Sequence, residues 1–181
     1  MTHDRLLIET PGADAAYLCR LDSPLGPILL ASGGDALTGL WFEGQKHFPG
    51  ALAASGREAA LPVFRETARW LEVYFSGREP DFLPALAPKG TAFQLAVWAR
   101  LLSIPYGERR TYAQLAAALA EAGGLSRVSP RAVGGAVGRN PISLLIPCHR
   151  VVGADGSLTG YAGGLARKRY LLDLERAGVG S

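Results

Sequence analysis

The segment LLIPCHRVVG, residues 144–153, holds the side chains of this sequence that are best suited to covalent chemistry. Cys148 stands between a proline and His149, with Arg150 next and apolar residues on both sides. A cysteine attacks as the thiolate, and with an ordinary pKa of about 8.5 only a small fraction is ionised at neutral pH. Cys148 therefore needs a neighbouring group that takes or stabilises its proton.

His149 is the nearest candidate for that base. On an extended segment neighbouring side chains point to opposite faces, so a contact with Cys148 would require a bridging water or a local bend. Glu175, near the end of the chain, is a carboxylate that could orient the histidine, as in other activated nucleophiles. For an isolated Cys-His pair a structural thiol is the commoner interpretation, so the rest of the sequence has to decide.

The first part of the chain predicts a small sheet followed by a helix. Between residues 15 and 43, short apolar runs are interrupted by DSPLG and SGGD, which fit tight turns, so we expect three short antiparallel strands. Residues 61–77 then place apolar side chains at helical spacing and end at Gly77, a typical C-terminal cap. The predicted apolar face consists of Phe64, Ala68, Leu71 and Phe75.

Three prolines between residues 78 and 90 predict a linker. It would separate an N-terminal α/β domain, residues 1–88, from a C-terminal domain, residues 89–181, that contains Cys148. We therefore expect two domains.

The second part of the chain is predicted to be mostly helical. Thr91, Thr111 and Ser129 are typical helix caps, and Pro130 fits the first turn of its helix. Two short helices joined by a turn and followed by a strand-like wing form a winged helix-turn-helix. The expected fold class is α+β: a small N-terminal antiparallel sheet with a helix, followed by a mostly helical winged helix-turn-helix domain.

The predicted helix RAVGGAVG is unusual because it contains three glycines. Each interior glycine costs roughly 1 kcal/mol relative to alanine, so some contact has to compensate. A helix with so little side chain can lie close to another helix or to DNA. Arg131, at its start, favours DNA, because a long cation beside a smooth surface suits docking onto a duplex.

Composition restricts the class of protein further. About 48% of the 181 residues are hydrophobic, which allows a real core. Residues 1–90 carry a net charge of −3 and residues 91–181 one of +6, which indicates either a polyanionic partner or a solvated basic face. The two cysteines are expected to be reduced, the histidines lack metal-site spacing, and the sequence predicts no membrane span or signal peptide, so we expect a cytoplasmic protein.

The motifs around Cys148 resemble a known family. NPISLLIPCHRVV, with RAVGGAVGRN before it and GSLTGYAGGLARKRYLLDLE after it, is similar to the active-site region of the methylated-DNA–protein-cysteine methyltransferases, the O6-alkylguanine-DNA alkyltransferases. GTAFQLAVWARLLSIPYG and TYAQLA resemble the same family, so the similarity is close over residues 89–176 and loose over residues 1–88.

The resemblance implies DNA repair by direct reversal. The protein would transfer a methyl or other alkyl group from O6 of guanine, and also from O4 of thymine, to Cys148, and each chain would act once because the thioether is stable. The substrate would be double-stranded DNA whose damaged base is flipped out of the helix. The family implies a monomer without cofactor or metal.

The resemblance also assigns roles to individual residues. His149 would be the base acting through water, Glu175 its partner, Asn140 a support for the active-site segment, and Tyr112 a hydrogen-bond donor to the flipped guanine. Arg131 would fill the gap left in the duplex. The residues expected at DNA with Arg131 are Ala132, Gly135 and Ala136, and those expected in the base pocket are Val151, Tyr161 and Ala162.

Two other functions remain open at this point. A non-enzymatic alkyltransferase-like protein would bind lesions without repair, but such proteins replace the acceptor cysteine, which is present here. A cysteine hydrolase would use Cys148 and His149 but would leave Tyr112 and the glycine-rich helix without a role. The segment AALAEAGGLSRVSP is also longer than the family usually has between the two helices of the motif.

Overall fold

A computed structural model describes residues 16–124 and 126–179 of the chain. The predictions for the first 15 residues, among them that they are not a signal peptide, concern residues outside the described ranges. Within the described ranges, none of the helices is both long and apolar enough to cross a membrane.

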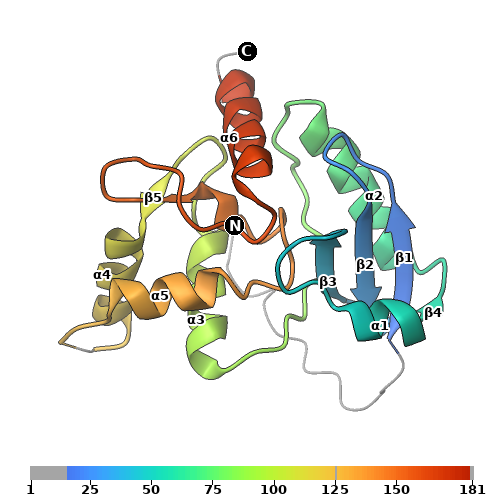
Figure 1. The fold of residues 1–181 in the computed structure, drawn as a ribbon, viewed down its shortest axis with the longest axis horizontal. Helices are drawn as coiled ribbons and strands as arrows, with labels where there is room; N and C mark the ends of the chain where they lie inside the picture. The colour runs from blue at the N-terminus through green and yellow to red at the C-terminus, as the bar shows by residue number, and fades with distance from the viewer. Residues whose placement is uncertain (1–15, 125, 180–181) are drawn as a thin grey trace.

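The first half forms a four-stranded sheet in the order β3-β2-β1-β4 (Figure 1). Strands β1 (Tyr17–Leu21), β2 (Ile28–Ser32) and β3 (Leu37–Phe42) pair antiparallel, as the turn motifs predicted. The fourth strand, β4 (Arg57–Glu58), was not predicted, and it adds a short parallel edge to β1.

Helices cover both faces of this sheet, since β2 is buried at every position. Helix α2 (Pro62–Phe75) packs on one face, where Ile28 and Leu30 point. The short α1 (Gly50–Ser55) lies at the other face, where Leu29 belongs to a second, smaller apolar cluster (Figure 1). Because β2 alternates between two covered faces, it consists of apolar residues almost throughout.

The second half contains α3 (Ala92–Leu102), α4 (Tyr112–Ala122), α5 (Pro130–Val137) and α6 (Leu165–Val179). The predicted caps are confirmed: Thr91 and Thr111 form capping boxes, and the Ser129 side chain accepts from the Ala132 amide. None of these four helices has an acidic residue in its first turn. Helices α4 and α5 pack against each other and against α3, which gives the predicted mostly helical unit after the sheet.

The predicted strand-like wing consists of only two paired strands of two residues each. Strand β5 (Arg110–Thr111) pairs parallel with β6 (Val151–Val152), directly after the cysteine segment. The connection between α4 and α5 spans residues 123–129.

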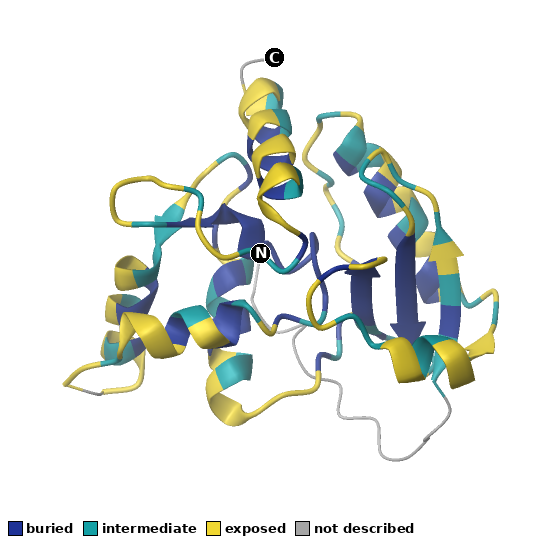
Figure 2. Cartoon of the chain, viewed as in Figure 1, coloured by how far each residue is buried: buried dark blue, intermediate teal, exposed yellow. Residues whose placement is uncertain are grey.

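The two halves share one apolar core. Figure 2 shows buried residues, in dark blue, in both halves. The Leu40 amide of β3 donates to the Pro141 carbonyl at 2.9 Å, and the Leu40 carbonyl accepts from Ser143 at 3.0 Å. The predicted linker also packs on the sheet, because Leu37 exchanges backbone hydrogen bonds with Ala85 and Ala87 and Leu86 is buried. The segment that precedes Cys148 is therefore fixed to the N-terminal sheet.

Candidate active site

Cys148 begins a 3₁₀ turn, Cys148–Arg150, and not the extended segment that the sequence analysis considered. The cause is local: the Cys148 amide bonds back to the Ile146 carbonyl at 2.7 Å, and the Arg150 amide to Pro147 at 3.0 Å. This is the bend that frees consecutive side chains from the strict alternation of a strand.

Asn140 holds this segment from the end of α5. Its side-chain amide donates to the carbonyls of Ile146 at 2.8 Å and Ile142 at 3.3 Å, while its Oδ1 accepts from the Ile142 amide at 3.0 Å. Within this clamp Leu144 adopts the left-handed region at φ 69°, which is uncommon for a bulky side chain. The buried Asn140 thus bonds to the segment that leads to Cys148.

The Cys148 thiol is almost completely buried, with 4% of the residue exposed. Burial raises its pKa, and a hydrogen bond from Asn140 and the positive charge of Lys168 oppose this only in part. Cys148 is therefore a neutral thiol at rest, and its reaction as a nucleophile requires a base.

His149 and Glu175 form a buried pair. The Nε2 atom of His149 lies 2.6 Å from Oε1 of Glu175, and both residues are 0% exposed. Burial lowers the pKa of His149 despite the nearby carboxylate. Burial alone would raise the pKa of Glu175, but the bonds from His149 and Arg150 outweigh it and lower this pKa to about 2. The pair therefore consists of a neutral imidazole and a carboxylate.

The protonation of the His149 ring follows from its partners. A carboxylate only accepts hydrogen bonds, so the short contact requires the proton on Nε2. The second ring nitrogen, Nδ1, then carries the lone pair; it is buried and has no hydrogen-bond partner among the described residues. An unpartnered basic nitrogen next in sequence to a buried thiol is suited to take its proton.

Three buried residues near this site were missed in the sequence. Arg150 bonds through Nε to Oε2 of Glu175 at 2.9 Å and through Nη1 to the Ile104 carbonyl at 2.6 Å. Tyr74, from α2, donates to Oε1 of Glu175 at 2.7 Å. Lys168, fully buried in α6, donates to the carbonyls of Val151 and Thr159, and burial lowers its pKa to about 8.

A sequence signal existed for two of these residues. Arg150 directly follows the Cys-His pair, and Tyr74 lies three residues after Leu71 on the same side of the predicted helix. A tyrosine at a buried helical position needs a partner for its hydroxyl.

The residues expected in the pocket come from three segments of the chain. The Tyr112 hydroxyl donates to the Thr159 carbonyl at 3.2 Å. The Tyr161 ring stands edge-on to His149, with centroids 6.5 Å apart, and its hydroxyl is buried without a partner in the described structure. Ala162 is half-buried and accepts from the Lys46 amide, while Val151 is fully buried.

Comparison with known proteins agrees with this site. The sequence profile of the 6-O-methylguanine DNA methyltransferase DNA binding domain matches residues 92–177, and that of the ribonuclease-like domain of the same protein matches residues 17–87. The methylated-DNA–protein-cysteine methyltransferase of Methanosarcina barkeri is 49% identical over 160 residues, which cover 88% of this chain and 96% of that protein. The chain belongs to the 6-O-methylguanine DNA methyltransferase family.

Other members of the 6-O-methylguanine DNA methyltransferase family are similar over most of their length. The methylated-DNA–protein-cysteine methyltransferase of Haemophilus influenzae is 44% identical over 164 residues, 90% of this chain and 87% of that protein. A crystal structure of Mycobacterium tuberculosis OGT in complex with DNA superimposes with a TM-score of 0.77 at 41% identity, covering 90% of this chain and 94% of that chain. The α+β architecture is therefore that of the family.

Helix α5, the glycine-rich helix of this methyltransferase, exposes only some of the residues that were expected to contact DNA. Arg131, Ala132 and Gly135 are exposed, and a Cβ atom on Gly135 would meet nothing within 4 Å. Ala136 differs from the expectation, because it is buried and its carbonyl accepts from Nε1 of Trp98 at 2.9 Å. Gly134 faces inward, where its Cβ would lie 3.6 Å from the Tyr112 ring.

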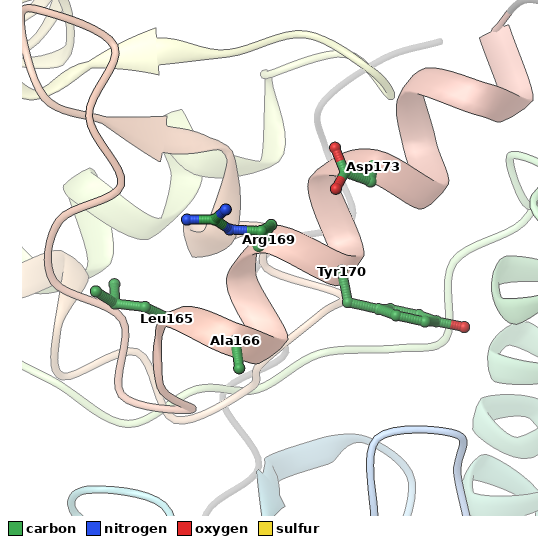
Figure 3. Close-up of a pocket in the computed structure, with 5 residues that line it drawn as sticks. All are labelled: Leu165, Ala166, Arg169, Tyr170 and Asp173. Carbon is green, nitrogen blue, oxygen red and sulfur yellow. The ribbon is translucent and has the colours of Figure 1, made fainter.

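A hollow of about 490 Å³ lies on the outer side of α6 in this methyltransferase (Figure 3). It is lined by Leu165, Ala166, Arg169, Tyr170 and Asp173, none of which takes part in the hydrogen bonds around His149. It is separate from the Cys148 site.

Proposed function

We propose that this protein repairs alkylated DNA by direct reversal, moving an alkyl group from O6 of guanine, and also from O4 of thymine, to Cys148. The single observation that carries the proposal is the buried Cys148 thiol beside His149, whose unpartnered Nδ1 provides a base for the thiol proton. Family membership supports the same reaction. The proposed partner is double-stranded DNA that contains O6-alkylguanine, bound by a monomer.

The transfer balances without a cofactor. His149 takes the thiol proton through a water molecule, and the Cys148 sulfur attacks the alkyl carbon. As the S–C bond forms, the C–O bond breaks, and its electron pair remains on the guanine, which then takes up one proton. The products are unmodified guanine and a thioether, from which no side chain regenerates the thiol, so each chain reacts once.

Tyr112 is the proposed donor to the departing guanine. At rest its hydroxyl is bonded to Thr159, so a base that enters the pocket replaces that carbonyl as its partner. A donor directed at developing negative charge contributes strongly in a site that excludes water. We propose that Val151, Tyr161 and Ala162 line the pocket.

Arg131 is the proposed side chain that replaces the flipped nucleotide in the duplex. It is exposed at the start of α5, next to Ala132 and on the same helix as the open face of Gly135. We propose residues 89–181 as the domain that contacts DNA and residues 1–88 as the domain that supports it.

The test is the intact mass of the protein after incubation with duplex DNA that carries O6-methylguanine. We expect one added methyl group per chain, located on the peptide that contains Cys148, and a plateau at that stoichiometry. Cys148→Ala should bind the same DNA without gaining mass. Methylation of Cys19, the other free cysteine in the described chain, or binding without any transfer by the wild-type protein, would contradict the proposal.

A further inference from the structure

Tyr74 reaches the His149–Glu175 pair from the first half of the chain. Its hydroxyl donates to Oε1 of Glu175 at 2.7 Å and its oxygen lies 3.2 Å from Nε2 of His149. The ring is fully buried, stacks on Trp70 at 5.1 Å, and stands edge-on to Tyr106 at 6.0 Å. Aromatic packing from both halves of the chain, Trp70 from the first and Tyr106 from the second, therefore fixes where this hydroxyl lies.

We propose that Tyr74 is a positioning residue for alkyl transfer, which keeps His149 neutral, with its proton on Nε2, through Glu175. This inference rests on the proposed function. The Tyr74 hydrogen is committed to the carboxylate, so the oxygen presents only lone pairs to Nε2. Nε2 then faces two acceptors, which keeps the proton there and leaves Nδ1 free as the base.

The same hydrogen bond limits how strongly Glu175 attracts a proton to the imidazole. A donor to a carboxylate disperses its negative charge, and this weakens the stabilisation of a neighbouring cation. Without Tyr74, Glu175 would stabilise protonated His149 more strongly, and protonated His149 cannot act as a base. The other titratable or charged groups around His149 are Cys148, Arg150, Tyr161 and Lys168.

The position of Tyr74 also gives the N-terminal half a part in the chemistry. Tyr74 is separated from His149 by 75 residues and from Glu175 by 101 residues. The hydroxyl is therefore at the active site only while the two halves remain packed together.

The experiment is the single-turnover rate of methyl transfer from duplex O6-methylguanine DNA, measured against pH at saturating DNA. With Tyr74→Phe we expect the rate at neutral pH to fall by roughly 10- to 150-fold, the range for one lost hydrogen bond to a charged group. The acidic limb of the profile should move to higher pH, because His149 becomes easier to protonate. The melting temperature and DNA affinity are measured on the same samples.

Tyr106→Phe is the matched control, because it removes a buried hydroxyl of the same aromatic cluster that has no hydrogen-bond partner in the described residues. It should leave the rate and the acidic limb unchanged. A second variant has 3-fluorotyrosine at position 74, whose more acidic hydroxyl donates more strongly, so its acidic limb should move to lower pH. The 3-fluorotyrosine variant tests the proposed role of Tyr74 even if Tyr74→Phe does not fold.

The outcomes separate this inference from the proposed function. A wild-type protein that transfers no methyl group contradicts the proposed function itself. A wild-type protein that transfers normally, with a Tyr74→Phe profile that superimposes on it, overturns the role of Tyr74. A lower rate with an unmoved acidic limb, or the same shift in Tyr106→Phe, also overturns it, since either result indicates packing alone.

Discussion

Glu175 is fully buried, and groups of the protein supply its hydrogen bonds in place of water. His149, Tyr74, Arg150 and the Gly107 amide all donate to its two oxygens. A carboxylate buried without such donors would take up a proton. The charge at the centre of the site is thus maintained by residues from three separate parts of the chain: Tyr74, Gly107 and the His149–Arg150 pair.

The first prediction is that Glu175 makes a large contribution to acid stability. Its folded pKa of about 2 lies below the ordinary 4.5, so its stabilising effect is complete above about pH 4.5 and is lost as the pH falls toward 2. The difference corresponds to about 3 kcal/mol of the free energy of unfolding. Urea unfolding at several pH values should show this loss in the wild type and not in Glu175→Gln.

Glu108 provides the control, since its ion pair with Arg110 is exposed. Glu108→Gln should keep the wild-type pH dependence and change stability by less than about 1 kcal/mol. Equal slopes for wild type and Glu175→Gln between pH 4.5 and 2 would contradict the prediction.

At the residue scale, the sequence predicted the neighbours of Cys148 better than its distant partners. Cys148, His149 and Asn140 lie within nine positions, and Glu175 was found because activated histidines commonly have a carboxylate. Tyr74 was missed because its partners are remote in sequence and only the packing of the two halves brings them together. Lys168 was missed because a lysine is normally exposed to solvent.

At the scale of elements, helices with strong caps were predicted and short irregular elements were not. Thr91, Thr111 and Ser129 begin helices as expected. The strand β4 consists of two exposed charged residues, which have no strand pattern, and the six-residue α1 has no fully buried position. The 3₁₀ turn at Cys148 was considered as an extended segment, since a short apolar run does not distinguish the two.

The second prediction concerns Arg131 on α5. Arg131→Ala should slow repair of duplex O6-methylguanine by roughly 10- to 100-fold, because the vacated site in the duplex stays unfilled and unstacking costs a few kcal/mol. Arg131→Lys should also be slow, since it keeps the charge but loses the planar group that stacks between bases. Single-turnover rates with duplex DNA and with free O6-alkylguanine measure the difference.

Both variants should react with the free base at close to the wild-type rate, because no nucleotide has to be flipped. If Arg131→Lys repaired duplex DNA at the wild-type rate, the role of Arg131 would be limited to a contact with a phosphate. Failure of both variants on the free base would assign it a role in folding.

At the scale of the molecule, the continuous core indicates that the two halves unfold together. Leu40 of β3 is fully buried, and its backbone amide and carbonyl both bond to the segment that precedes Cys148. The predicted boundary between residues 88 and 89 separates two sequence patterns, but the side chains of both parts pack in one apolar core. The division into two domains therefore remains a prediction.

The third prediction tests this coupling with Leu40→Ala. Replacing a buried leucine by alanine lowers the free energy of unfolding by about 2–5 kcal/mol. In hydrogen exchange, the most protected amides of β2 and of α5 should both lose protection by that amount. Leu83→Ala replaces an exposed leucine and should change the protection of neither β2 nor α5. Loss of protection in β2 with α5 unaffected would show that the halves unfold separately.

The absence of acidic residues at the starts of α3, α4 and α5 has a consequence for long-range electrostatics. Aligned peptide dipoles place about half a positive charge at a helix N-terminus, and proteins often neutralise it with an acidic residue in the first turn. These helices begin with Thr91, Thr111 and Ser129 and have no acid there, so their positive ends remain uncompensated in the half of the chain that carries a net charge of +6. Part of the field that attracts a polyanion thus belongs to the backbone, does not titrate, and persists when individual arginines are replaced.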